Sequence, residues 1–387
     1  MTARSEPRPF QYRVPDEALA DLRRRLAHTR LPDAPPGTPW ELGTEVDYLA
    51  GLIAYWREEF DWRQQEAHLN TFAQFRLQLD DVDVHAIRVE GRGPNPVPLL
   101  LCHGWPGSVL EFLDLIPRLT DPAAFGLDPA ISFTVIAPSL PGYGLSFQPG
   151  QARFGIEEIA DRLAEVMKAF GHGRFFVQGG DWGSFIASRI AMSYPDNVAG
   201  IHLNMMPIRR DVALGSKTDE ELAHLARLTA WSKEEAGYVS IQGTKPQTLA
   251  FGLMDSPAGL AAWLVEKFRT WSDCDGSIEN AISRDHLLAN IAYYWFTGSI
   301  GSSFYPYYAR LKRGWPLPAK DPIDVPTGYA EFPGEINRPP RSLAEKVFSD
   351  IRQWTVMPKG GHFAALEQPE LLAGDIRSFV ARLRTAA

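Results

Sequence analysis

Residues 175–192 place an acidic side chain in a glycine-rich turn between a predicted strand and a predicted helix. Residues 175–177 have the apolar character of a buried strand, residues 179–183 read GGDWG, and residues 185–192 are predicted to begin a helix. The same arrangement with serine at its centre, G-x-S-x-G, exposes a nucleophile above a sheet. Because the central residue here is Asp181, the sequence predicts a carboxylate in the nucleophile's position.

An aspartate nucleophile restricts the chemistry that this turn can perform. A serine needs a base to become nucleophilic, whereas an aspartate, with an ordinary pKa of about 4, is ionised at neutral pH. A carboxylate attacks saturated carbon poorly unless the carbon carries a good leaving group or belongs to a strained ring, as in alkyl halides and epoxides. The product is an ester on the protein, so we expect a second step in which water attacks the carbonyl of Asp181.

A histidine and a second acid later in the chain are candidates to activate that water. In hydrolases with this strand–turn–helix motif the nucleophile comes first, the acid second and the histidine last. Asp181, Glu335 and His362 follow this order, and His362 lies in a glycine-bounded loop between the last predicted strand and the last predicted helix. Three nearby carboxylates are alternatives for the acid: Glu331, Asp321 and Asp324.

Two backbone N–H groups are predicted to form an oxyanion hole. The turn HGWPGS, residues 103–108, directly follows an apolar strand, where such folds place one donor, and the other donor follows the nucleophile. These donors would be the backbones of Trp105 and Trp182, whose side chains we expect in the wall of an apolar pocket. We interpret His103 as a structural histidine.

The leaving group determines which further residues are needed. Epoxide opening generates an alkoxide, which calls for proton donors such as phenols in a dry pocket. Four tyrosines are candidates: Tyr238, Tyr305, Tyr307 and Tyr308. A halide leaves as an anion and needs an N–H donor, which the indole of Trp182 could supply. These residues alone leave both chemistries open.

The elements that must position these residues divide the chain into four parts. Residues 1–70 contain one-sided helices and are predicted to form a helical N-terminal extension. Residues 71–205 and 321–387 alternate strands with helices, which predicts a largely parallel α/β sheet. Residues 206–320 are rich in Trp, Leu, Ala, Lys and Glu and contain no convincing βαβ unit. We expect them to form a helical insertion between the nucleophile and the acid.

Composition excludes several other classes of function. The 387-residue chain has a net charge of −8 and no basic run, which argues against a nucleic-acid partner and fits a neutral or cationic small molecule. Its two cysteines, Cys102 and Cys274, provide no disulfide framework, so we expect a reducing cytoplasm. No uninterrupted apolar run of about 18 residues is present to predict a membrane span.

Several segments resemble those of microsomal-type epoxide hydrolases, and together they cover nearly the whole chain. They are residues 8–32, 103–108 (HGWPGS), 179–184 (GGDWGS), 237–268, 296–308 (FTGSIGSSFYPYY), 325–336 (VPTGYAEFPGEI) and 359–372 (KGGHFAALEQPELL). The resemblance implies an α/β-hydrolase fold under a helical cap, with Asp181 as nucleophile, His362 as base and Glu335 as its partner. It also implies Tyr238 and Tyr307 as the acid pair, a turn at Trp105 whose following proline can be cis, and a reaction without metal or cofactor.

The resemblance carries further expectations about substrate and setting. It predicts an epoxide hydrolase that makes vicinal diols from a small hydrophobic epoxide. It leaves open whether the chain forms a homodimer. The anchor of the membrane form is not recognised in these residues, so a soluble bacterial-type member is expected, with a role in enediyne-like natural-product biosynthesis. Two alternatives remain. One is a haloalkane dehalogenase, although the HGWP turn lacks the side-chain amide that such enzymes often carry there. The other is a catalytically inactive binding protein.

Overall fold

A mixed β-sheet passes through the described part of the chain, which in this computed structural model comprises residues 6–208, 212, 215, 217–317 and 322–385. Within these residues the sheet has nine strands. In spatial order they are β1 (Arg8–Phe10), β2 (Gln74–Gln78), β3 (Asp83–Val89), β5 (Phe133–Pro138), β4 (Val97–Cys102), β6 (Phe175–Gly179), β7 (Val198–Leu203), β8 (Thr327–Glu331) and β9 (Ile351–Val356).

The sheet is parallel from β5 to β9 and antiparallel at its other edge. Strands β4 and β5 pair in parallel, as do β4 and β6 and each later pair, whereas β1, β2, β3 and β5 pair antiparallel. The central strands are continuous apolar runs because helices cover both of their faces. The carboxyl ends of β4 and β6 therefore lie side by side, which brings the two glycine-rich turns together.

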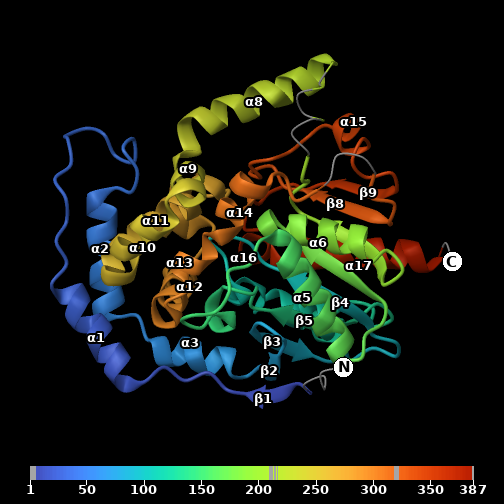
Figure 1. Cartoon of the computed structure of the whole chain (residues 1–387), viewed down its shortest axis with the longest axis horizontal. Helices are drawn as coiled ribbons and strands as arrows, with labels where there is room; N and C mark the ends of the chain where they lie inside the picture. Colours follow the sequence, from blue (N-terminus) through green and yellow to red (C-terminus); the bar gives the residue numbers. More distant parts are fainter. Residues whose placement is uncertain (1–5, 209–211, 213–214, 216, 318–321, 386–387) are drawn as a thin grey trace.

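Helices and short 3₁₀ turns flank this sheet. They are η1 (Val109–Phe112), α4 (Leu115–Thr120), η2 (Pro122–Phe125), η3 (Gly144–Ser146), α5 (Ile156–Ala169), α6 (Asp181–Ser193), α15 (Arg341–Ala344), α16 (Ala364–Glu367) and α17 (Pro369–Thr385). Helix α5 packs against α6 (Figure 1), and α4 packs against α17. Helix α5 buries Ile156, Ile159 and Leu163 on one stripe, the spacing of a helix with one face on a core.

A set of helices connects β7 to β8 and forms the cap. It comprises α8 (Asp219–Glu235), α9 (Gly237–Thr244), α10 (Pro246–Asp255), α11 (Pro257–Trp271), η4 (Ile278–Asn280), α12 (Arg284–Thr297), α13 (Ile300–Ser303) and α14 (Tyr305–Arg313). In Figure 1, α8 extends away from the rest of the cap along the top of the view. Across the described residues, no single helix is long and apolar enough to cross a membrane. Helices α10 and α11 have the required length and apolarity only when taken together, and they are bent by 117° to each other.

The N-terminal extension joins the edge of the sheet to the cap. It contains β1, α1 (Asp16–Ala27), α2 (Val46–Glu58) and α3 (Trp62–Leu69). It therefore includes a strand, whereas the sequence predicted a helical extension. Helices α1 and α2 contact α11, and α3 contacts α12 (Figure 1). The Thr44 hydroxyl donates to the Ala262 carbonyl at 2.6 Å, and the Tyr55 hydroxyl donates to Asp285 at 2.9 Å. The extension therefore fixes the cap from outside.

Candidate active site

Asp181 lies at a sharp turn between β6 and α6. It is the first residue of α6, four residues earlier than the sequence predicted, because the glycine-rich turn itself forms the start of the helix. Its φ of +47° lies in the left-handed region, which non-glycine residues rarely adopt. A Cβ at Gly183 would come within 2.0 Å of the Cys102 carbonyl oxygen, so glycine lets the helix lie against the end of β4. The turn thus holds the Asp181 carboxylate at the carboxyl edge of the sheet.

His362 connects Asp181 to Glu335. Its Nδ1 lies 2.9 Å and 3.0 Å from the two carboxylate oxygens of Glu335, and its Nε2 lies 3.5 Å from Asp181 Oδ2. Since a carboxylate can only accept, Nδ1 carries the hydrogen of the neutral ring and Nε2 is left to face Asp181. Both Glu335 and His362 are buried. The structure therefore places His362 between Asp181 and Glu335, the three residues that the chain order predicted to lie together.

Electrostatics around His362 favour the imidazolium in the free protein. Burial disfavours the charged ring, but the carboxylates of Glu335 and Asp181 outweigh it and raise the His362 pKa well above its usual range. His362 therefore holds a proton in the free protein and can act as a base only after losing it.

Glu335 is oriented by the loop that follows β8. The backbone N–H of Asn337 donates to Glu335 Oε1 at 3.1 Å, and the Asn337 side chain donates to the Met206 carbonyl at 2.8 Å. These bonds fix the carboxylate against the loop that leaves β7.

The other nearby carboxylates have different partners. Glu331 accepts from the Trp354 indole at 3.0 Å, and Asp324 accepts from the Ser349 hydroxyl at 2.9 Å. Asp321, the third alternative, lies outside the described residues. Neither described alternative contacts the imidazole.

A further buried carboxylate, Glu367 on α16, holds the loop around His362. It accepts backbone hydrogen bonds from Gly361 and Asp273 at 2.8 Å and from Phe363 at 2.9 Å. The His362 N–H donates to the Trp271 carbonyl at 2.9 Å. Trp271 ends cap helix α11. The histidine loop is therefore hydrogen-bonded to the end of α11 directly and, through Glu367, to Asp273 of the cap.

The HGWPGS turn supplies one N–H to the carboxylate. The Trp105 N–H donates to Asp181 Oδ1 at 2.7 Å, and the Trp105–Pro106 peptide bond is cis, as the resemblance implied. The Trp182 N–H belongs to the first turn of α6, where backbone N–H groups have no partner within a helix. Both predicted oxyanion donors therefore lie next to Asp181.

His103 in the same turn has structural contacts. Its Nε2 accepts from the Leu140 N–H at 3.1 Å, and its Nδ1 lies 3.0 Å from the Gly104 carbonyl. Burial lowers the pKa of His103 to about 4, so the ring is neutral at pH 7. These contacts agree with the structural interpretation.

Two cap tyrosines lie over the elbow. The rings of Tyr238 on α9 and Tyr307 on α14 are 5.7 Å apart. The Trp105 ring stacks on Tyr238 at 5.3 Å and meets Tyr307 edge-on at 5.8 Å, while Trp182 lies 4.9 Å from Tyr307. Burial, and then the charge of Asp181, raise the pKa of Tyr238, and burial raises the pKa of Tyr307. Both phenols therefore carry their protons at neutral pH.

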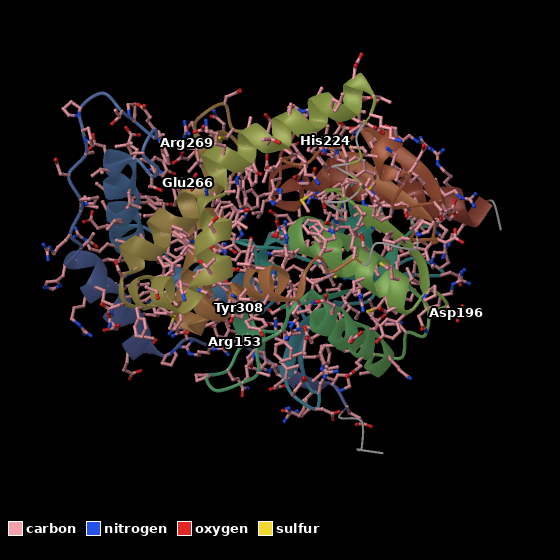
Figure 2. The ribbon with its side chains drawn as sticks, turned by 45° about the horizontal axis from the view of Figure 1, so that its top comes forward. Arg153, Asp196, His224, Glu266, Arg269 and Tyr308 are labelled. Atoms are coloured by element: carbon pink, nitrogen blue, oxygen red, sulfur yellow. The ribbon has the colours of Figure 1, made fainter. Side chains whose placement is uncertain are left out.

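Tyr305 and Tyr308 lie elsewhere on α14. Their rings are 5.6 Å from each other, the Tyr305 hydroxyl accepts from Arg313 at 3.5 Å, and Lys312 Nζ lies 5.6 Å from the Tyr308 ring. Both side chains are partly exposed, and Figure 2 labels Tyr308. Of the four candidate phenols, the structure thus gathers Tyr238 and Tyr307 around the two tryptophans.

Glu111 is a site residue that the sequence reasoning missed. It lines a cavity of about 20 Å³ together with Asp181, His362 and Trp105. Burial raises the pKa of Glu111 to about 8, with His362 opposing the shift and Asp181 adding to it. The available signal was that Glu111 is the lone acidic residue of residues 103–113. Within the described residues, no group of three or more His, Cys, Asp or Glu side chains is arranged to bind a metal.

Family models and sequence relatives agree with this geometry. A model described as "Epoxide hydrolase N terminus" matches residues 7–112, and one described as "alpha/beta hydrolase fold" matches residues 97–250. "Epoxide hydrolase 1" of Oryctolagus cuniculus is 39% identical over 401 residues, which cover 96% of this chain and 88% of that protein.

Solved structures extend the similarity to the whole fold. The juvenile hormone epoxide hydrolase of the silkworm Bombyx mori superposes with a TM-score of 0.90 at 31% identity, covering 99% of this chain and 96% of that one. The epoxide hydrolase of Aspergillus niger gives a TM-score of 0.86 at 29% identity, covering 98% and 97%. With its elbow, its cap and these relatives, this chain belongs to the microsomal-type epoxide hydrolase family, as an α/β hydrolase that cleaves the ether bond of an epoxide.

Proposed function

We propose that the enzyme forms a covalent ester between Asp181 and the epoxide carbon and then hydrolyses it to a vicinal diol. The observation that carries this proposal is the position of the Asp181 carboxylate. Oδ1 accepts from the Trp105 N–H at 2.7 Å, and Oδ2 faces His362 Nε2 at 3.5 Å. One oxygen is thereby held where a carbonyl oxygen needs a donor, while the other is directed toward the reacting groups.

In the first step, Oδ2 of Asp181 attacks a ring carbon of the epoxide. The new bond joins Oδ2 to this carbon, the ring C–O bond breaks, and its electrons pass to the ring oxygen. Tyr238 or Tyr307 donates a proton to that oxygen, because both phenols are protonated and lie above the elbow. The step leaves a hydroxyalkyl ester on Asp181 and a tyrosine phenolate. The phenolate regains its proton as the His362 imidazolium gives one up, so the ring is neutral for the second step.

In the second step, water attacks the ester carbonyl. Its proton passes to His362 Nε2, and Glu335 stabilises the imidazolium through Nδ1. The N–H groups of Trp105 and Trp182 hold the oxyanion of the tetrahedral intermediate. Collapse breaks the bond between the carbonyl carbon and the alkoxide, which takes the proton from His362 and leaves as the diol. The Asp181 carboxylic acid then gives its proton to His362, which restores the carboxylate and the imidazolium of the free enzyme.

An isotope experiment tests the ester. With enzyme in excess over styrene oxide, a single turnover in ¹⁸O water should give unlabelled diol and should place the label in the peptide that contains Asp181. The reason is that hydrolysis cleaves the ester at its carbonyl, so the oxygen of Asp181 leaves with the product. Label in the first-turnover diol would show that water opens the epoxide directly, and would overturn the proposal.

The aromatic walls support a small, apolar epoxide as the substrate. The rings of Trp105, Trp182, Tyr238 and Tyr307 pack against one another beside the nucleophile, and their polar atoms are the two phenol hydroxyls and the two indole N–H groups. The family relationship sets aside haloalkane dehalogenase activity, and the assembled Asp181, His362 and Glu335 set aside an inactive binding protein. Comparing the consumption of styrene oxide with that of a bromoalkane tests both exclusions. A role in natural-product biosynthesis stays a prediction.

A further inference from the structure

Glu111 lies between two cavities. On one side it lines the catalytic cavity with Asp181 and His362, and on the other it lines a second cavity between η1, α3 and α12. Each cavity has a volume of about 20 Å³, which is sufficient for one water molecule. Glu111 is thus the acidic group that both cavities share.

The carboxyl group of Glu111 is available to bind water. Among the described residues, no protein group donates a hydrogen bond to it, although it is largely buried. Gly107 leaves the space that it occupies, because a Cβ there would lie 2.1 Å from Glu111 Oε2. A buried polar group without a protein partner is usually satisfied by an ordered water.

The second cavity extends toward solvent. At its outer end His286 and Asp114 have side chains that are 41% and 45% exposed, and their polar atoms are 3.8 Å apart. Gln65 and His68 of α3 and Asn290 of α12 add polar atoms to a lining that is otherwise largely apolar. Polar side chains are therefore present in the second cavity between its outer end and Glu111, where they can bind water.

The ester intermediate makes such a path useful. Once Asp181 carries the substrate, the alkyl group occupies the space beneath Tyr238 and Tyr307, so water from that side is obstructed. Water from the side of Glu111 would enter next to His362, which must take its proton. The two reactants would then reach Asp181 from different directions.

We propose that Glu111 binds the hydrolytic water and that the second cavity delivers it to the ester. The proposal rests on the covalent mechanism described above. The water donates one hydrogen bond to Glu111 and transfers its other proton to His362 as its oxygen bonds to the Asp181 carbonyl carbon. The hydrogen facing Glu111 stays on the oxygen.

Single-turnover kinetics of Glu111→Leu and Glu111→Gln test the water-binding role. Ester formation can be followed by the fluorescence of Trp105 and Trp182, and ester decay by the mass of the intact protein. In Glu111→Leu, decay should slow roughly 10- to 100-fold, while ester formation changes by less than about threefold. Glu111→Gln keeps an oxygen that can accept from water, so its decay should lie between those of Glu111→Leu and the wild type.

Ala289→Leu tests the delivery path separately. Ala289 on α12 lines the second cavity but not the catalytic cavity, so a larger side chain should slow ester decay and leave ester formation unchanged. Glu59→Gln, the same chemical change at an exposed position ending α2, is the matched control and should behave as wild type.

Two outcomes would overturn the proposal. One is an equal slowing of both steps in Glu111→Leu, which would indicate a structural role. The other is normal decay in Ala289→Leu, which would mean that water enters by another path. If the wild type and His362→Gln form no ester at all, the covalent mechanism itself has failed, which is a distinct result.

Discussion

At the scale of single residues, the pKa of His362 follows the charge of its neighbours. In the free protein two carboxylates raise this pKa, and in the proposed mechanism one of them, Asp181, loses its charge when the ester forms. Removing that charge lowers the His362 pKa when the ring must act as a base. The nucleophile thereby prepares its own base for the second step.

This coupling predicts a pH dependence. Neutral His362 is the active form in ester hydrolysis, so decay should be fast above the pKa of the ester form and should be lost as the pH falls through it. Its midpoint should lie below the pKa of His362 in the free enzyme. Stopped-flow decay profiles, compared with an NMR titration of the free imidazole, measure both values. Coincident midpoints would contradict the coupling.

The tyrosine pair predicts a graded response to mutation. Tyr238→Phe and Tyr307→Phe should each slow ester formation, and the double variant should lose about 10²–10⁴-fold, because neither phenol remains to protonate the alkoxide. Ester decay on a preformed adduct should change little. Tyr308→Phe, on the outer part of α14, is the control, and a normal rate in the double variant would exclude both phenols as donors.

Sequence reasoning named residues that the structure brings together at the elbow and missed two carboxylates beside them. Asp181, Glu335 and His362 follow from a motif and a chain order, both of which the one-dimensional sequence displays. Glu367 accepts backbone N–H groups from Gly361 and Phe363 in its own loop and from Asp273, which is 94 residues away, so its residue type gives no indication of this role. Glu111 is the lone acidic residue of residues 103–113, but its place beside two cavities follows only from the fold.

At the scale of elements, the contact between α6 and β4 depends on Gly183. In Gly183→Ala the new methyl would meet the Cys102 carbonyl at 2.0 Å, so we expect a loss of about 1–3 kcal/mol in the free energy of unfolding. Activity should fall further, because Asp181 moves with the helix. Urea unfolding measures the first effect and steady-state kinetics the second.

A matched glycine provides the control for that prediction. Gly374 lies within α17, and a Cβ there would meet nothing within 4 Å. Gly374→Ala should therefore be neutral or stabilise the protein by about 0.5–1 kcal/mol, as expected for alanine in a helix. Equal stability of the two variants would show that the close approach at Gly183 is readily relieved.

The limits of element prediction have local causes. The buried strands β4 and β5 were evident as apolar runs, whereas β1 was not, because three residues that include a proline form too short a pattern to read. Helix α6 begins at Asp181 because tertiary contacts hold that residue in a conformation that propensity disfavours. The errors therefore occur where distant parts of the chain impose the local structure.

At the scale of the whole molecule, α12 connects the three structural parts. Toward the sheet, the Tyr293 hydroxyl lies 2.9 Å from the Ser139 hydroxyl and accepts from the Leu145 N–H at 3.1 Å. Toward the nucleophile, Asn290 and Tyr294 each donate to carbonyls of the HGWPGS turn at 2.8 Å. Toward the extension, α12 packs on α3, with the Phe296 ring 5.0 Å from Trp62.

Helix α8 has much weaker support. Its buried side chains are Glu221 and His224, and Figure 2 labels His224 on this helix. Glu221 contacts the sheet region by accepting from Lys346 at 2.7 Å and from Ser342 at 3.0 Å. Helices with so little buried surface open locally at low free-energy cost. Within the cap, α12 is therefore held firmly and α8 is held loosely.

Amide hydrogen exchange should reveal this difference. Amides of α8 should exchange by local opening at rates far above the global limit, while those of α12 should approach the protection of β4, because opening α12 disrupts the sheet, turn and extension contacts together. Tyr293→Phe removes two buried hydrogen-bond contacts and should lower the protection of α12 by about 1–3 kcal/mol without altering α8. Because Asn290 and Tyr294 hold the turn that carries Trp105, this variant should also slow both half-reactions. Equal protection of α8 and α12 in the wild type would mean that the cap opens as one unit, and the support of the oxyanion turn would then come from the core alone.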